Sequence, residues 1–389
     1  MRARAIRDGV MWMGAVDWER RVFDSLVPIP DGTSYNAYLV KGSGGTALID
    51  TVEPEMGDRM RSQLDEVGHV DFVISQHAEQ DHSGYLPQVL ERFPDAPLYS
   101  TPLGKRMLVD HLGIDGDRVR PVKDGDTIDL GDRSLRFIHT PWVHWPETMC
   151  TYLAEEKILF SCDFFGSHLA TSRLYAGDDG AVIEAAKLYY GEIMQPFRNH
   201  IRKNLEKLGA LEIELIAPSH GPAHDRPQAI LEAYAEWSAE TPRNKVVLPH
   251  VTMHGSTGLM VQRLIAALVD RGVDVVPVDL VTLDEGRLAM ALIDAATVVF
   301  GTPTVNGGPH PRVATVAGLV NYLKPKTRFI SVIGSFGWST TVGKNLPAML
   351  PDLKAEVIEP VLSRGLPGPE DMAAVDALAE TIAKRHREL

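Results

Sequence analysis

The stretch Phe72-Val73-Ile74-Ser75-Gln76-His77-Ala78-Glu79-Gln80-Asp81-His82 decides the fold of the first half of the chain. It begins with a short apolar run, typical of a buried strand, and continues into a loop that is dense in potential metal ligands. His77, Glu79 and Asp81 alternate, so in an extended loop their side chains point the same way. His82 faces apart from Asp81 and can serve a second ion. This one loop therefore predicts a site for two metal ions.

Three further apolar runs end close to a side chain of ligand type. Leu135-Arg136-Phe137-Ile138 leads to His144, Ile158-Leu159-Phe160-Ser161 to Asp163, and Leu215-Ile216-Ala217-Pro218 to His220. Buried strands that end in loops place the following side chains at the edge of a sheet. We therefore expect a dinuclear site, with Asp163 as the bridge between the ions because it lies opposite the paired cluster. Its expected ligands are His77, Glu79, Asp81, His82, His144, Asp163 and His220.

The chemistry of these side chains narrows the choice of metal. The set contains no thiolate, because Cys162 stands beside Asp163 on a predicted strand and is interpreted as a core residue. Imidazole combined with several carboxylates suits iron or manganese at least as well as zinc. Glu147, three residues after His144, is expected either to orient the His144 imidazole from outside the ligand set or to be a solvated loop carboxylate.

Length and composition set wider limits. A chain of 389 residues is long enough for two domains, each with a full core. The net charge of −13 argues against nucleic acid or an anionic membrane as a partner. Two cysteines fit a reducing compartment rather than a disulfide framework. We find no signal peptide and no apolar run long enough to span a membrane, and expect a cytoplasmic protein.

The short polar segment at residues 238–245 contains Pro242 and predicts a domain boundary. We expect a metal-binding domain at residues 1–241 and a second domain at 245–389. In the first domain, paired strands with flanking helices predict a layered αββα sandwich. Its expected strands are 9–14, 35–40, 46–50, 71–75, 133–138, 149–153, 157–161 and 213–217, and its expected helices lie near 84–92, 103–111, 181–208 and 226–238.

Strands and helices alternate strictly in the second domain. This order predicts a doubly wound, open sheet of five parallel strands. The expected strands are 246–251, 273–278, 297–300, 328–333 and 356–361, and the expected helices start near 257, 284, 311, 340 and 369.

Ligands of such sheets bind at the carboxyl ends of the strands, so the loops found there are informative. The loop after the first strand is rich in hydroxyl groups and opens a helix, which makes either an anion cradle or an ordinary helix cap. The loops after the third and fourth strands supply glycines, backbone donors and the flat ring of Trp338. The candidate cofactor-binding residues are Thr252, Met253, His254, Gly255, Ser256, Thr257, Pro303, Thr304, Val305, Asn306, Gly307, Ser335, Phe336, Gly337, Trp338 and Ser339.

The ligand pattern resembles the metallo-β-lactamase superfamily, whose hydrolases usually carry His where this chain has Glu79. The Glu form, together with the stretches at residues 145–149 and 161–166, resembles the flavodiiron proteins, also called A-type flavoproteins. This resemblance implies a non-haem diiron site. It assigns one iron to His77, Glu79, His144 and Asp163, and the other to Asp81, His82, Asp163 and His220.

The second domain resembles flavodoxins, and its three loops resemble their phosphate loop and two isoalloxazine loops. The resemblance implies that FMN binds there. Val305 and His254 stand where flavodoxins often have aromatic residues, so Trp338 is the expected stacking partner.

The resemblance also implies an activity and partners. FMN and two irons together store four electrons, which is the number needed to reduce dioxygen to two waters. Two electrons are enough to convert two nitric oxide molecules to nitrous oxide and water. Tyr189 or Tyr190 resembles a tyrosine that lines the gas pocket and donates a proton or hydrogen bond there; the alternative interpretation, which the residues favour slightly, is an aromatic on a helix surface. The implied assembly is a head-to-tail homodimer, or a tetramer built from it. The sequence has no C-x-x-C pair, so we expect a separate electron donor such as a rubredoxin or a reduced deazaflavin.

Two other functions remain open from the residues. A zinc hydrolase of the metallo-β-lactamase type would use a metal-bound hydroxide as its nucleophile. A flavodoxin-like electron carrier would keep the second domain and retain only a vestigial metal pocket. Glu79 and the completeness of the ligand set favour the flavodiiron interpretation.

Overall fold

The computed structural model describes residues 2–389, so Met1, the first residue of the predicted first domain, lies outside the described residues. The chain divides into two compact units. The first unit runs to Tyr189 and resumes over Phe197–Ser238, and the second contains Tyr190–Pro196 and Ala239–Leu389. The predicted domains 1–241 and 245–389 do not anticipate that Tyr190–Pro196 belongs with the second unit.

Two sheets build the first unit, in the strand orders β1-β2-β5-β6-β7-β8-β9 and β10-β11-β12-β13-β14. The strands of the first sheet are β1 Arg4–Arg7, β2 Val10–Asp17, β5 Thr33–Lys41, β6 Thr46–Ile49, β7 Phe72–Ile74, β8 Leu98–Ser100 and β9 Val119–Pro121. Those of the second are β10 Thr127–Asp129, β11 Ser134–His139, β12 Met149–Leu153, β13 Ile158–Cys162 and β14 Leu215–Pro218. A separate hairpin joins β3 (Val22–Phe23) to β4 (Val27–Pro28).

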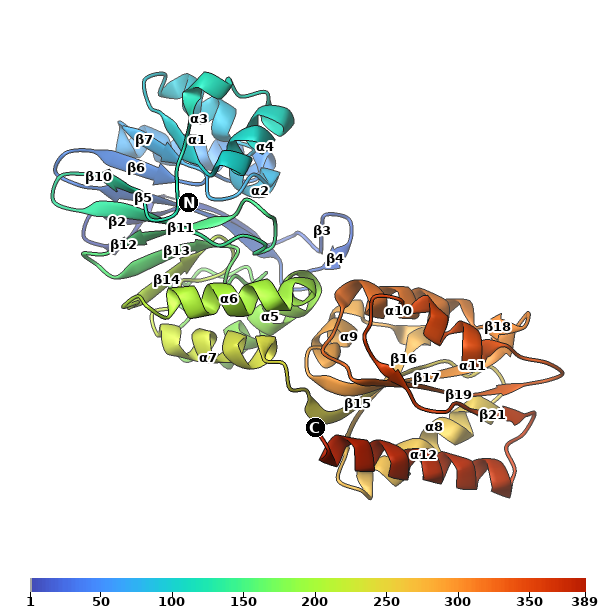
Figure 1. The fold of residues 1–389 in the computed structure, drawn as a ribbon. Coiled ribbons are helices and arrows are strands. Elements are labelled where there is room, and N and C mark those ends of the chain that lie inside the picture. Colours follow the sequence, from blue (N-terminus) through green and yellow to red (C-terminus); the bar gives the residue numbers. More distant parts are fainter. Residues whose placement is uncertain (1) are drawn as a thin grey trace. The chain divides into compact units, whose positions relative to one another are not determined.

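Helices cover the outer face of each sheet (Figure 1). The first sheet carries α1 (Gly57–Val67), α3 (Leu86–Arg92) and α4 (Pro102–Leu112). The second carries α5 (Gly180–Tyr189), α6 (Arg198–Leu208) and α7 (Pro227–Ser238). The predicted αββα sandwich is therefore confirmed.

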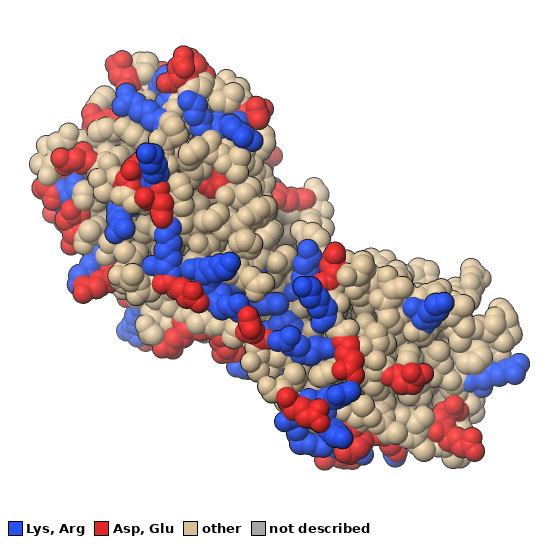
Figure 2. Space-filling view, in the orientation of Figure 1, with Lys and Arg blue, Asp and Glu red and all other residues tan. Residues whose placement is uncertain are grey.

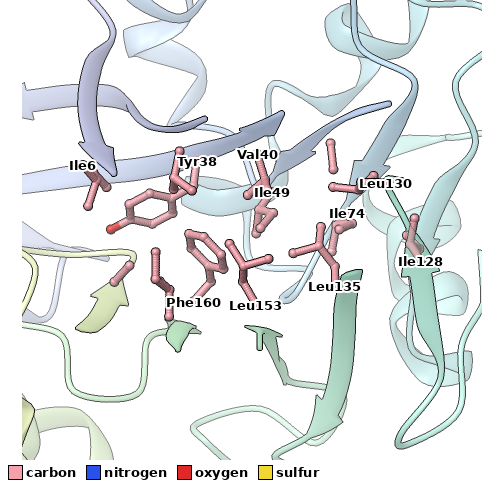
Figure 3. Packing of buried hydrophobic residues seen from close by; sticks show 14 of the residues in the cluster. Ile6, Tyr38, Val40, Ile49, Ile74, Ile128, Leu130, Leu135, Leu153 and Phe160 are labelled. Carbon is pink, nitrogen blue, oxygen red and sulfur yellow. The ribbon is translucent and has the colours of Figure 1, made fainter. Parts of the chain in front are cut away.

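The core of this unit lies between the two sheets, where their inner faces meet (Figure 3). Alternate residues of a strand point to one face, so β5 sends Tyr38 and Val40 into this core. The Tyr38 ring lies 5.1 Å from the ring of Phe160 on the opposite sheet. Burying each large apolar side chain of this kind stabilises the fold by about 1.5–3 kcal/mol relative to leaving it exposed.

One largely parallel sheet forms the centre of the second unit, in the order β16-β15-β17-β19-β20. Its strands are β15 Arg243–His250, β16 Asp274–Asp279, β17 Ala295–Val305, β19 Phe329–Phe336, β20 Glu356–Val357 and β21 Val361–Arg364, with the short β18 Gly308–Pro309 paired to β17. The helices are α8 Ser256–Val269, α9 Glu285–Leu292, α10 Pro311–Leu323, α11 Val342–Asn345 and α12 Pro369–Arg387. Helices α8 and α12 cover one face and α9, α10 and α11 the other (Figure 1), which confirms the doubly wound, flavodoxin-like sheet.

Two predicted elements are interrupted. The helix expected over 181–208 stops at Tyr189, passes through a π-helical turn at Tyr190–Met194, and resumes as α6 at Arg198. In the second unit a Cβ atom at Gly191 would lie 3.1 Å from the backbone of α9, so a larger residue would push the two segments apart. The strand expected over 356–361 is split into β20 and β21, because Pro360 has no N–H for the ladder.

The surface shows acidic and basic side chains interspersed on the face drawn in Figure 2. None of the helices found among residues 2–389 is both long enough and apolar enough to cross a membrane.

Candidate metal centre and flavin loops

Four of the predicted ligands form a first group: His77, Glu79, His144 and Asp163. The Glu79 Oε2 atom lies 3.0 Å from the Nε2 atom of His77 and 3.0 Å from that of His144. The Asp163 Oδ2 atom lies 3.5 and 3.6 Å from the same two nitrogens. His77 and Asp163 are buried, whereas the side chains of Glu79 and His144 are 14% and 17% exposed. Solvent therefore reaches the first group at the side chains of Glu79 and His144.

A second group contains Asp81, His82 and His220, all of which are buried. The Asp81 Oδ2 atom lies 3.2 Å from His82 Nε2 and 3.1 Å from His220 Nε2. The other oxygen of Asp163, Oδ1, lies 3.0 Å from His82 Nε2 and 3.4 Å from His220 Nε2. All seven predicted ligands thus lie in one place, and Asp163 presents one oxygen to each group.

The donor atoms fit a pair of cations. Both carboxylate oxygens of Asp81 and Asp163, and both ring nitrogens of His82, are buried and make no hydrogen bond to any of the described residues. Buried polar atoms normally have partners, so atoms that converge without hydrogen-bond geometry are typical of a metal site. Burial raises the pKa of Asp163, but His82 and His220 outweigh it and hold that pKa well below its usual range. The carboxylate is therefore ionised and available to a cation.

Local structure explains the division into two groups and corrects one expectation. Glu79 is extended, with φ −62° and ψ 143°, but it caps a short helix, α2 (Gln80–Ser83). The alternation of side chains therefore ends at Glu79, and Asp81 turns toward His82 instead of lying with His77. The expectation that His77, Glu79 and Asp81 point the same way was wrong, because a helical turn replaces the extended loop.

Glu147 supports His77, not His144. Its Oε1 atom accepts hydrogen bonds from His77 Nδ1 at 2.6 Å and from the Ala78 N–H at 3.0 Å. Glu147 is buried, so it is not a solvated loop carboxylate either. Spacing along the chain suggested His144, but the strand β7 and the loop before β12 bring residues 77 and 147 together. A carboxylate on Nδ1 fixes the tautomer in which Nε2 is free to bind metal.

Sequence reasoning missed several neighbours of the centre. The ring of His168 lies 4.8 Å from that of His220, and its Nδ1 atom is 2.9 Å from Thr33 Oγ1. The Phe23 ring lies 4.7 Å from His168, which brings the β3–β4 hairpin to this pocket. At the tip of that hairpin, burial and the charge of Glu79 raise the pKa of Asp24 to about 6. A single histidine or aspartate in a loop carries no sequence signal that would have identified either residue.

The two predicted pocket tyrosines lie in different surroundings. The Tyr189 ring lies 4.9 Å from His168 and 5.9 Å from His220, so it borders the second group. Tyr190 belongs with the second unit. Both rings are buried, so neither is an aromatic on a helix surface. Cys162 is buried as expected, but its thiol lies with His82 and Asp163, and burial raises its pKa well above the usual range. It is therefore a neutral neighbour of the centre and not a thiolate.

The three candidate flavin loops follow adjacent strands of the second unit. Strand β17 lies between β15 and β19, and Pro303 on β17 pairs with Ser335 on β19. Hydroxyl contacts tie the loops together, at 3.0 Å between Thr257 and Ser335 and at 2.8 Å between Thr304 and Thr340. The loops therefore form one surface at the carboxyl edge of the sheet.

This surface fits a flat ring that carries a phosphate. Helix α8 begins after Gly255, which has no side chain to cap the helix, and backbone N–H groups at a helix N-terminus can bind an anion. A Cβ atom at Gly255, Gly307 or Gly337 would meet nothing within 4 Å, which leaves open space along the loops. Trp338 is 82% exposed and offers its ring face. Thr252 serves the turn itself, since its Oγ1 atom accepts hydrogen bonds from the N–H groups of Gly255 and Gly258.

Comparisons with known proteins agree with this geometry. Residues 33–221 match the model of the ODP family beta lactamase. The chain is 35% identical to a nitric oxide reductase of Moorella thermoacetica, with 98% of both chains covered.

Solved structures match over nearly the whole length. Rubredoxin oxygen:oxidoreductase from the anaerobe Desulfovibrio gigas superposes with a TM-score of 0.94 at 31% identity, and 99% of each chain is covered. The flavodiiron protein from Giardia intestinalis superposes with a TM-score of 0.91 at 28% identity, over 100% of this chain and 97% of that one. The chain therefore belongs to the flavodiiron protein family.

Proposed function

We propose that this protein reduces dioxygen to water, or nitric oxide to nitrous oxide, at two iron ions held by the seven converging side chains. The observation that carries the proposal is the placement of Asp163, whose Oδ2 faces His77 and His144 while Oδ1 faces His82 and His220. A carboxylate in this position binds two cations side by side. The relatives named above as reductase and oxidoreductase favour this chemistry over a zinc hydrolase.

The chain contributes ligands and a closed environment to the reaction. Bound iron would supply electrons to a diatomic oxidant, and FMN would replace them. The hard oxygen donors of Glu79, Asp81 and Asp163 suit iron. Phe23 and Tyr189 pack around the second group and limit access by water. The partly exposed side chains of Glu79 and His144 mark the side from which a small gas would enter.

FMN is proposed to bind the three loops of the second unit. The N-terminus of α8 would take the phosphate, and Trp338 would stack on the ring system. The donor named in the relative from Desulfovibrio gigas is a rubredoxin. We propose a donor of that kind for this chain, with a reduced deazaflavin as the second candidate and the cytoplasm as the location.

A head-to-tail homodimer is part of the proposal. Large apolar side chains are exposed beside both centres: Trp338, Met253 and Leu366 near the flavin loops, and Val22 and Leu26 on the β3–β4 hairpin. Exposed apolar groups beside a functional site are typical of an interface. In the proposed dimer the flavin loops of one copy cover the hairpin of the other. Leu26→Glu should convert the dimer to a monomer in sedimentation velocity, whereas Val269→Glu, an equally exposed position on α8, should not.

Metal and flavin content test the function directly. Protein made in iron-replete cells should contain two irons and one FMN per chain. After anaerobic reduction, rapid mixing with dioxygen or nitric oxide should reoxidise the flavin at least as fast as the enzyme turns over in the steady state. Two zinc ions without flavin would support the hydrolase instead, and flavin without metal would support the electron carrier.

A further inference from the structure

The side chain of Asn36 on β5 is a buried carboxamide that bridges the loop carrying His220. Its Nδ2 atom donates to the Pro218 carbonyl at 2.8 Å and to the Gly221 carbonyl at 2.7 Å. These two carbonyls lie on either side of His220, so one side chain spans the loop. Asn36 is only 2% exposed, so water does not compete for these bonds.

The orientation of the carboxamide is fixed from its other side. The indole Nε1–H of Trp12 donates to Asn36 Oδ1 at 2.9 Å. An indole N–H only donates and the two carbonyls only accept, so the amide nitrogen must face the loop. A carboxylate of the same shape would satisfy Trp12 but would bring oxygen against oxygen at the loop.

Strand β5 presents a row of contacts to the same loop. Residues at alternate positions of a strand share a face, which aligns Ser34, Asn36 and Tyr38. The Ser34 carbonyl accepts from His220 Nδ1 at 2.7 Å, and the Tyr38 hydroxyl donates to the Pro218 carbonyl at 2.6 Å. Because the first of these bonds is made directly by the imidazole, any movement of the loop along β5 changes where His220 Nε2 points.

We propose that Asn36 is the positioning residue of the second metal site: it sets the direction of His220 toward Asp81 and Asp163 without touching the ion. This inference rests on the proposed dinuclear centre. Two histidines of the first group are held elsewhere, because His77 is fixed by Glu147 and His144 follows a different strand. Loss of Asn36 should therefore weaken one ion and leave the other.

The test uses Asn36→Asp in the full chain, stripped of metal and titrated anaerobically with Co²⁺ as a spectroscopic probe. Wild-type protein should bind two Co²⁺ ions in two steps. In the variant, one step should keep its affinity and the other should weaken at least tenfold, the range found when groups that orient ligands are removed. Tyr38→Phe, which removes one bond to the same loop and keeps its ring against Phe160, should weaken the same step by a smaller factor.

Gln63→Leu is the matched control for a merely structural role. Gln63 is a fully buried carboxamide of the same unit that bonds both backbone groups of Gly14 at 2.9 Å, and Gly14 on β2 is the residue that pairs with Asn36 on β5. It should lower the thermal midpoint and leave both Co²⁺ steps unchanged. The inference is overturned if Asn36→Asp and Tyr38→Phe bind both ions as wild type does, or if Gln63→Leu weakens the same step. A wild-type protein that binds fewer than two ions would instead refute the proposed function.

Discussion

Replacing Glu147 by Gln tests how much a buried carboxylate outside the ligand set contributes to metal binding. In the native protein its Oε1 atom accepts from His77 at 2.6 Å and from the Ala78 N–H at 3.0 Å. A hydrogen bond to a charged group contributes about 1.5–3 kcal/mol, and a neutral bond contributes roughly half of that. Gln keeps an acceptor and loses the charge, so about 0.8–1.5 kcal/mol should disappear. Each 1.4 kcal/mol changes an equilibrium constant about tenfold, so iron affinity should fall by roughly that factor.

Glu147→Ala should have a larger effect, because it leaves two buried donors without an acceptor. We expect a loss of about a hundredfold in affinity, at the upper end of what such substitutions cause. Anaerobic competition with a chelator of known affinity measures both variants, and Glu91→Gln on the exposed face of α3 is the control. The loss should fall on the ion of the first group. Wild-type affinity in Glu147→Gln, or equal weakening of both ions, would refute the assignment of Glu147 to His77.

Three further outcomes follow from named side chains. Asp163→Ala should remove both irons and leave one FMN per chain; elemental analysis that finds two irons would show that Asp163 is not the bridge. Trp338→Ala should weaken FMN binding to the apoprotein about three- to tenfold in a fluorescence titration, since aromatic stacking contributes about 0.5–1.5 kcal/mol, with little change in the unfolding midpoint; unchanged affinity would exclude the stacking role. Burial lowers the pKa of His386 from 6.5 to about 4. Between these pH values the unfolded state binds more protons than the folded state, so the free energy of unfolding falls as the pH is lowered from 6.5 toward 4. Urea unfolding of the second unit should lose roughly 1 to 2 kcal/mol over this window, allowing for solvent screening, and His386→Gln should flatten the dependence; a native slope in that variant would contradict it.

The parts of the fold that repeat a strong pattern could be predicted from the sequence. Apolar runs such as Leu215–Pro218, and the alternation of strands and helices after residue 245, predicted the layers of both units. Very short strands, such as β8 at Leu98–Ser100, were missed because three residues carry too little periodicity. The interruption after Tyr189 was also missed, because it depends on the close approach that Gly191 makes to α9, a tertiary contact.

The candidate site shows the same limit. The seven candidate ligands could be selected from the sequence because they follow the ends of four apolar runs, and the structure brings all seven together. Their roles as iron ligands and the flavin contacts of the loops stay predictions. The partner of Glu147 could not be inferred, because its contact with His77 joins residues 70 positions apart. Asn36 looked like an ordinary strand residue, and only the register of β5 against the His220 loop reveals its contacts.

The placement of Asp163 between two groups also constrains how this family can change. In the proposed centre, a lineage that loses this aspartate loses a donor from both groups in a single step. Loss of His144 or His220 removes a donor from one half only. Descendants with a single ion should therefore retain the aspartate and differ at the histidines.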